Sequence, residues 1–83
     1  MPQVTIYTTR VCPYCSRAKR LLKRQGIAFN EIPIDGDPAR MQIMMERSGR
    51  HTVPQIFIDD LAIGGYDDLA QLDERGELDA LLG

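Results

Sequence analysis

The chain has 83 residues, of which 43% are hydrophobic and 27% charged, with a formal net charge of −2 and a pI of about 5.2. A chain this short supports one hydrophobic core, so we expect residues 1–83 to form a single domain. The near-balanced charge argues against a general nucleic-acid or membrane binder, and no apolar stretch approaches the roughly 20 residues of a membrane span. The amino terminus lacks the pattern of a secretory signal, so we expect a cytoplasmic protein.

The first half of the chain predicts a strand, a helix and a second strand. Residues 4–8, VTIYT, are rich in β-branched and aromatic side chains and predict a strand. Residues 14–25 carry apolar side chains at helical spacing, with Pro13 suited to the first turn and Gly26 to the end. Residues 27–34 alternate and predict the second strand. A strand, helix and strand in this order form a right-handed unit with parallel strands.

The next segments predict a helix and two short strands. The helix spans 38–48, with Asp37 as its cap and Pro38 in its first turn. Three methionines on it are expected to pack in the core: Met41, Met44 and Met45. Strands are predicted over 55–58 and 61–63, joined by an Asp-Asp turn.

A last helix is predicted after Gly64 and Gly65, which interrupt the preceding strand. Asp67 or Asp68 is placed to cap this helix, and its apolar side chains are expected to continue to Leu82. The predicted order is therefore β-α-β-α-β-β-α, an α/β arrangement.

Two cysteines lie where the first strand gives way to the helix, as Cys12-Pro13-Tyr14-Cys15. A C-x-x-C in this context is typical of a thioredoxin-like redox motif. Unpaired N–H groups and the helix dipole at this end favour a thiolate, and such thiols have pKa values of about 3.5–7.5 rather than about 8.5. We expect Cys12 to attack a disulfide and the more sheltered Cys15, one turn later, to resolve it.

Two other interpretations of the cysteines fit the sequence less well. A passive disulfide is disfavoured because a reducing cytosol would not preserve it. A zinc site requires four N or S ligands, and His51 is the one further candidate of that kind. We therefore expect reactive chemistry and no metal.

Four segments make the sequence resemble the glutaredoxins, of the short bacterial dithiol kind (glutaredoxin 3-like). They are Cys12–Cys15, Thr52–Pro54, Ile56–Ile58 and Gly64–Leu69. The resemblance spans nearly the whole chain and implies a thioredoxin-like fold with a four-stranded mixed sheet flanked by helices. It also implies an enzyme, a glutathione-dependent thiol–disulfide oxidoreductase.

The resemblance further implies which residues bind glutathione. A cis Pro54 would place the Val53 backbone beside the reactive sulfur, to pair with the cysteinyl part of glutathione like an added strand. Two aspartates and the backbone near Gly65 would hold the γ-glutamyl end, and Tyr14 would form an aromatic wall. The implied contacts are Tyr14, Thr52, Val53, Pro54, Gly65, Asp67 and Asp68.

The sequence departs from the family pattern at three positions. Thr9 stands where many relatives have lysine, and Met41 where some have glutamine or arginine, so the partner of the glycyl carboxylate is open. The candidates for the contact with the glycyl carboxylate in this chain are Thr9, Arg10 and Arg40. Tyr66 replaces a third cysteine found in several relatives.

In the mechanism that the resemblance implies, Cys12 alone reduces glutathione mixed disulfides. Cys12 and Cys15 together reduce protein disulfides, such as that of ribonucleotide reductase. Glutathione is a co-substrate, no cofactor is bound, and glutathione reductase with NADPH acts upstream. Expected partners are glutathionylated or disulfide-containing proteins, with no nucleic acid or membrane, and we expect a monomer.

Alternative functions and a basic helix face stay open at this point. The chain could carry a [2Fe–2S] cluster between two subunits, or be a redoxin reduced directly by thioredoxin reductase. The first predicted helix has a basic face that is either solvated or a docking surface for acidic partners: Arg17, Lys19, Arg20, Lys23 and Arg24.

Overall fold

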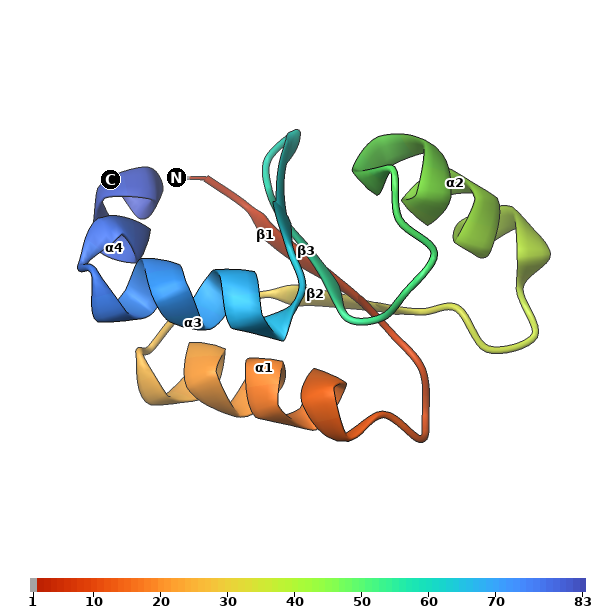
Figure 1. The fold of residues 1–83 in the computed structure, drawn as a ribbon, viewed down its shortest axis with the longest axis horizontal. Coiled ribbons are helices and arrows are strands. Elements are labelled where there is room, and N and C mark those ends of the chain that lie inside the picture. The colour runs from red at the N-terminus through yellow and green to blue at the C-terminus, as the bar shows by residue number, and fades with distance from the viewer. Residues whose placement is uncertain (1) are drawn as a thin grey trace.

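The computed structural model describes residues 2–83 (Figure 1). In chain order its elements are β1 (Val4–Thr8), α1 (Pro13–Arg24), β2 (Asn30–Pro33), α2 (Pro38–Ser48), β3 (Gln55–Ile58), β4 (Leu61–Gly64), α3 (Tyr66–Glu74) and α4 (Glu77–Leu82). Within residues 2–83, none of the helices combines the length and the apolar character needed to cross a membrane.

The four strands form one mixed sheet in the order β2-β1-β3-β4. β1 pairs in parallel with β2, which confirms the strand–helix–strand unit predicted from the first half of the chain. β1 pairs antiparallel with β3, with Tyr7 opposite Gln55, and β3 pairs antiparallel with β4. The end of β1 and the start of β3 therefore lie side by side. The loop that follows β1 and the loop that precedes β3 thus meet at the same end of the sheet.

The sheet separates two helical layers. Strand alternation puts Ile6 and Ile56 on one face and Tyr7 and Phe57 on the other. α1 and α3 cover the first face and α2 the second (Figure 1). The first core contains Val4, Ile6, Ala18, Leu21, Leu22, Ile56, Ile58, Leu69 and Leu78. The second contains Tyr7, Ile34, Met44 and Phe57.

The second strand is shorter than predicted. The sequence pattern predicts residues 27–34, whereas β2 spans Asn30–Pro33. Ile27 donates its N–H to the Leu22 carbonyl at 2.9 Å, so this part of the chain is still closing the end of α1. Ile27 and Phe29 nevertheless pack against the first core, which explains their apolar character.

The last helix is divided, which corrects the expected continuous helix. α3 ends at Glu74, and Gly76 has a φ of 70°, a left-handed conformation that ends helices and favours glycine. The N-cap position of α3 is occupied by Gly65, so Asp68, one of the two predicted caps, acts from the N3 position of a capping box. Asp68 lies three residues further on, and its carboxylate reaches back to accept the Gly65 N–H.

The three methionines of α2 do not share one environment. Met44 is fully buried in the second core, and Met41 packs against that core while partly exposed. Met45 is 39% exposed, so the expectation that all three pack in the core is wrong for this residue.

Candidate active site

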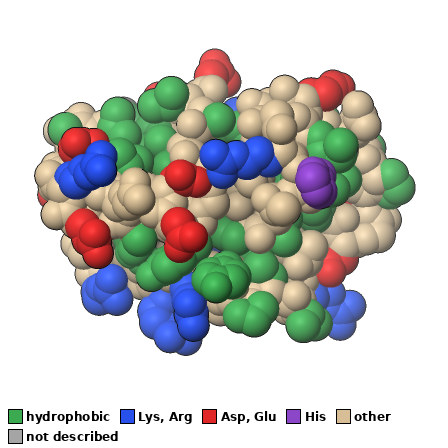
Figure 2. Space-filling view, viewed as in Figure 1, with side chains coloured by type: hydrophobic (Ala, Val, Ile, Leu, Met, Phe, Trp, Pro, Cys, Tyr) green, Lys and Arg blue, Asp and Glu red, His purple; other side chains and the backbone are tan. Residues whose placement is uncertain are grey.

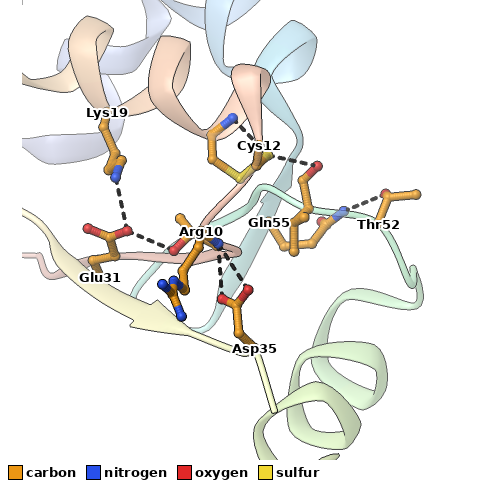
Figure 3. The surroundings of a disulfide bond; sticks show 10 residues. Arg10, Cys12, Lys19, Glu31, Asp35, Thr52 and Gln55 are labelled. Atoms are coloured by element: carbon orange, nitrogen blue, oxygen red, sulfur yellow. Dashed lines mark hydrogen bonds and ion pairs between the residues drawn. A yellow bond between two sulfur atoms is a disulfide. The ribbon is translucent and has the colours of Figure 1, made fainter. Parts of the chain in front are cut away.

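Cys12 occupies the N-cap of α1, where extended backbone turns into helix. Its Sγ accepts a hydrogen bond from the Cys15 N–H at 3.0 Å, and a disulfide joins the two cysteines (Figure 3). Cys12 is half-buried, whereas Cys15 is 1% exposed. A helix amide thus points at the more accessible sulfur, the geometry that stabilises a thiolate there after reduction.

The loop before β3 brings a second backbone segment to this sulfur. The Val53 carbonyl oxygen lies 3.8 Å from Cys12 Sγ, although the residues are 41 positions apart. The Val53–Pro54 peptide bond is cis, as the resemblance implied. Gln55 is buried, and its Nε2 donates to Thr52 Oγ1 at 3.2 Å, which ties the loop to the start of β3.

A third segment comes from the β4–α3 junction. Asp68 Oδ2 accepts from the Gly65 N–H at 2.9 Å and forms an ion pair with Arg50 Nη1 at 3.0 Å. These two donors hold the pKa of Asp68 below its usual range, the Gly65 N–H having the larger effect. Gly64 has a φ of 117°, which only glycine adopts readily, so the chain can turn tightly into α3 here.

The three segments line one groove with a volume of about 190 Å³. Its walls are Tyr14, Arg50, Thr52, Val53, Pro54, Gly65, Tyr66, Asp67 and Asp68. All seven contacts implied by the resemblance are therefore brought together. A larger hollow of about 520 Å³ lies between Pro2–Val4, the α1–β2 connection and Leu82. Neither cysteine is among the residues that line either hollow, but the groove is bordered by Val53, whose carbonyl oxygen lies 3.8 Å from Cys12 Sγ.

Comparison with known proteins identifies the family. A family model described as Glutaredoxin matches residues 4–63. Glutaredoxin 3 of Escherichia coli (strain K12) is 60% identical over 82 residues, which cover 99% of each chain. The chain belongs to the glutaredoxin family. Like other glutaredoxins it is an enzyme, a thiol–disulfide oxidoreductase, and Cys12 and Cys15 are its redox pair.

Solved glutaredoxin structures share the fold. The solution structure of glutaredoxin from Brucella melitensis is 54% identical, with a TM-score of 0.87 over 99% of this chain and 89% of that one. The crystal structure of a buckwheat glutaredoxin–glutathione complex is 28% identical, with a TM-score of 0.88 over 98% of this chain and 76% of that one. The thioredoxin-like fold predicted from the sequence is confirmed.

Two groove residues of this glutaredoxin were not predicted as contacts. Arg50 reaches Asp68 across 18 residues of chain, and the sequence pattern gives no sign of this pairing. From the sequence, Tyr66 stands out only because it replaces a cysteine found in several relatives. Its ring lies 6.2 Å from that of Tyr14, centroid to centroid, so the two tyrosines form a common aromatic wall.

Thr9 lies outside this groove. It lines a neighbouring hollow of about 450 Å³ together with Met41 and His51. Val53 borders both the groove and this hollow, so the hollow adjoins the loop that approaches Cys12.

Of the two arginine candidates, Arg10 is held through its backbone and Arg40 through its side chain. Arg10 donates its backbone N–H to both Asp35 carboxylate oxygens, at 3.0 and 3.1 Å, which anchors the loop before Cys12 (Figure 3). Arg40 forms an ion pair with Asp37 at 3.3 Å and donates to the Pro33 carbonyl at 3.1 Å. Neither arginine lines the groove.

A polar cluster fastens α1 to the sheet near the redox pair. The buried Thr8 donates its hydroxyl to Glu31 at 2.7 Å, and Lys19 pairs with the same carboxylate oxygen at 3.0 Å (Figure 3). The Thr8 hydrogen bond, aided by Lys19, lowers the pKa of Glu31. The cluster links β1, β2 and α1 and so helps to hold the helix that carries both cysteines.

Proposed function

We propose that this glutaredoxin uses glutathione as its co-substrate and reduces glutathione mixed disulfides and protein disulfides. The observation that carries the proposal is the groove of about 190 Å³, whose walls combine backbone, aromatic and charged groups beside Cys12. The buckwheat glutaredoxin of the same fold was solved as a complex with glutathione.

The cysteinyl part of glutathione would lie against the loop before β3. The Val53 carbonyl already lies 3.8 Å from Cys12 Sγ, so a peptide whose sulfur joins Cys12 passes along the Val53 backbone. Backbone pairing of this kind adds the ligand as a short strand. Tyr14 and Tyr66 would form the aromatic wall of this site, with Thr52 and Pro54 completing it.

The γ-glutamyl end presents an ammonium and a carboxylate to the groove. One Asp68 oxygen already accepts from both Gly65 and Arg50, so we assign the ammonium to Asp67, which is exposed and accepts no side-chain hydrogen bond within residues 2–83. Arg50 uses one of its five N–H donors on Asp68 and retains others for the carboxylate. The first N–H groups of α3 add further donors.

The monothiol reaction requires Cys12 alone. Its thiolate attacks the glutathione sulfur of a mixed disulfide, and the substrate sulfur leaves as a thiolate that takes up a proton. A second glutathione thiolate then attacks the glutathionyl sulfur bound to Cys12, which releases glutathione disulfide and restores the Cys12 thiolate. Glutathione reductase, using NADPH, would return that disulfide to glutathione.

The dithiol reaction requires both cysteines. Cys12 attacks a protein disulfide, and Cys15 then loses its proton and attacks the Cys12 sulfur, so the protein leaves as a dithiol. The Cys12–Cys15 disulfide of the structure is the oxidised product of this route. Two glutathiones reduce it again. We propose ribonucleotide reductase as one such substrate, the cytoplasm as the location, and a monomeric single domain as the working form.

Turnover of a small glutathione mixed disulfide, coupled to glutathione reductase and NADPH, tests the proposal. We expect Cys12→Ser to be inactive and Cys15→Ser to keep substantial activity, because only the dithiol route needs the second thiol. Absence of glutathione-dependent turnover in the native protein would refute the proposal. Reduction by thioredoxin reductase, or a bound [2Fe–2S] chromophore, would then indicate one of the alternative functions.

A further inference from the structure

The charges of the chain are distributed unevenly around the redox pair. α1 contains five Lys or Arg residues and no Asp or Glu, although the chain as a whole has 10 basic and 12 acidic residues. All twelve carboxylates therefore lie outside the helix that begins at Cys12. Lys19 is paired with Glu31. The other four basic residues of α1 are exposed and form no ion pair within residues 2–83: Arg17, Arg20, Lys23 and Arg24.

Five exposed residues surround Cys12 in the chain and form what we call the approach surface: Arg10, Val11, Pro13, Tyr14 and Arg17. Val11 is 92% exposed and Tyr14 is 53% exposed. The Arg17 guanidinium carbon lies 5.1 Å from the centre of the Tyr14 ring. Figure 2 shows hydrophobic side chains along the lower edge of the molecule, with Lys and Arg on both sides of them. Figure 1 places the start of α1 at this edge.

The fold itself makes little use of these side chains. Val11 belongs to neither core cluster. Arg10 is held through its backbone N–H, and its guanidinium forms no hydrogen bond or ion pair within residues 2–83. The acidic group that faces this loop is Asp35, whose two oxygens are taken by that same N–H.

The groove and the approach surface share only Tyr14. A glutathione held in the groove would therefore leave the approach surface to the other half of the disulfide under attack. We propose that this surface selects polypeptide disulfides with acidic side chains, and an apolar side chain, next to the reacting cysteine. The inference rests on the proposed function and names the substrate class of the same site.

Charge and apolar contact act at different stages of this selection. Arg10 and Arg17 attract a carboxylate-bearing segment and pair with it, which speeds association and fixes its orientation. Val11, Pro13 and Tyr14 cover an apolar neighbour of the cysteine and remove it from water. A nucleic acid fits less well, because the chain outside α1 holds all twelve acidic residues against five basic ones, and this excess of negative charge repels a long polyanion.

Matched peptide substrates test the proposal. Short peptides with one central cysteine are linked to glutathione and differ only in the residues beside that cysteine, which are Glu, Gln or Lys. At about 0.1 M salt we expect kcat/KM to fall from Glu to Gln to Lys, by about tenfold overall for contacts with two exposed arginines. The difference in kcat/KM between the Glu and Lys peptides should decrease at about 1 M salt, where the Debye length is about 3 Å.

Charge reversal at Arg17 tests whether the preference for Glu peptides comes from the approach surface. Arg17→Glu should reverse the Glu-over-Lys preference. The matched control is Arg24→Glu, which changes net charge equally but lies about 18 Å along the helix axis from Cys12, and it should keep the preference. Val11→Ser should reduce the advantage of Leu over Ser beside the substrate cysteine by two- to threefold.

The outcomes separate the two proposals. Equal kcat/KM for Glu and Lys peptides, with normal turnover of the small glutathione mixed disulfide, would overturn the approach surface and leave the proposed function standing. An equal effect of Arg17→Glu and Arg24→Glu would also overturn it, because the preference would then follow net charge alone. No turnover of the small substrate would refute the proposed function instead.

Discussion

The guanidinium of Arg50 lies 3.0 Å from Asp68 Oδ2, and the same oxygen accepts the Gly65 N–H at 2.9 Å. The pair joins the loop before β3 to the start of α3, two segments that both line the groove beside Cys12. One ion pair therefore fixes the relative position of two walls of the proposed glutathione site.

Replacing Arg50 should weaken glutathione binding more than it slows the chemistry. Arg50→Met removes one charge-assisted donor at a half-exposed position, so we expect KM for a small glutathione mixed disulfide to rise three- to tenfold. The value of kcat should change by less than about twofold, since Arg50 touches no reacting sulfur in the proposed site. Arg50→Lys should restore part of the binding, and Arg24→Met is the control for lost charge. A KM equal to that of the native protein would contradict the assigned role.

The Asp68 carboxylate should make stability depend on pH in the acid range. Its pKa is lowered in the folded state, so its contribution is present above about pH 4, the pKa of an unfolded aspartate, and is lost as pH falls through the folded value. Asp68→Asn should reduce the free energy of unfolding by about 0.5–1 kcal/mol at pH 7, discounted for exposure. Urea titrations should show this difference shrinking below about pH 4. The control Asp67→Asn should have a smaller effect at neutral pH, and a difference that grew in acid would contradict the assignment.

The two adjacent glycines of the β4–α3 junction should respond differently to alanine. Gly64 has a φ of 117°, and an added Cβ would lie 2.8 Å from Asp68 Cγ and 3.1 Å from Arg50 Nη1. Gly64→Ala should therefore cost about 2 kcal/mol or more of unfolding free energy. At Gly65 the nearest contact for a Cβ is the Pro54 oxygen at 3.6 Å, an ordinary distance. Gly65→Ala should cost less than about 1 kcal/mol. Thermal and urea unfolding measure both, and equal losses would show that the strain at Gly64 is not the cause.

Neighbouring methionines of α2 provide a test of the second core. Met44 is 0% exposed, so Met44→Ala should cost about 2–4 kcal/mol through lost contacts and a residual cavity. Met45 is 39% exposed, so Met45→Ala should cost less than about 1 kcal/mol. Urea midpoints of the two variants measure the difference. Similar losses at both positions would mean that the packing described for α2 is wrong.

The redox pair and the order of elements were predictable from the sequence by itself. Cys12 and Cys15 follow a β-branched strand and open a helix, and both signals are local because strand and helix periodicity and N-terminal capping act over a few residues. The short apolar run Ile56–Ile58, entered through Pro54, likewise predicts the strand that the structure contains. The family resemblance added the cis Pro54 and the groove residues, which no local pattern indicates.

Tertiary structure decided what depends on contacts between distant segments. Residues 27–29 lie outside β2 in the structure, and the Ile27 N–H is bonded to the Leu22 carbonyl at the end of α1. The unequal burial of Met44 and Met45 depends on how α2 packs against the sheet. The sequence does not predict the ion pair between Arg50 and Asp68, which are 18 positions apart. The antiparallel pairing of β3 with β4 brings the two residues within reach of each other. The preference of a segment for helix or strand depends on a few neighbouring residues and can be predicted from the sequence. Ion pairs and the walls of the groove depend instead on which distant segments the fold brings into contact.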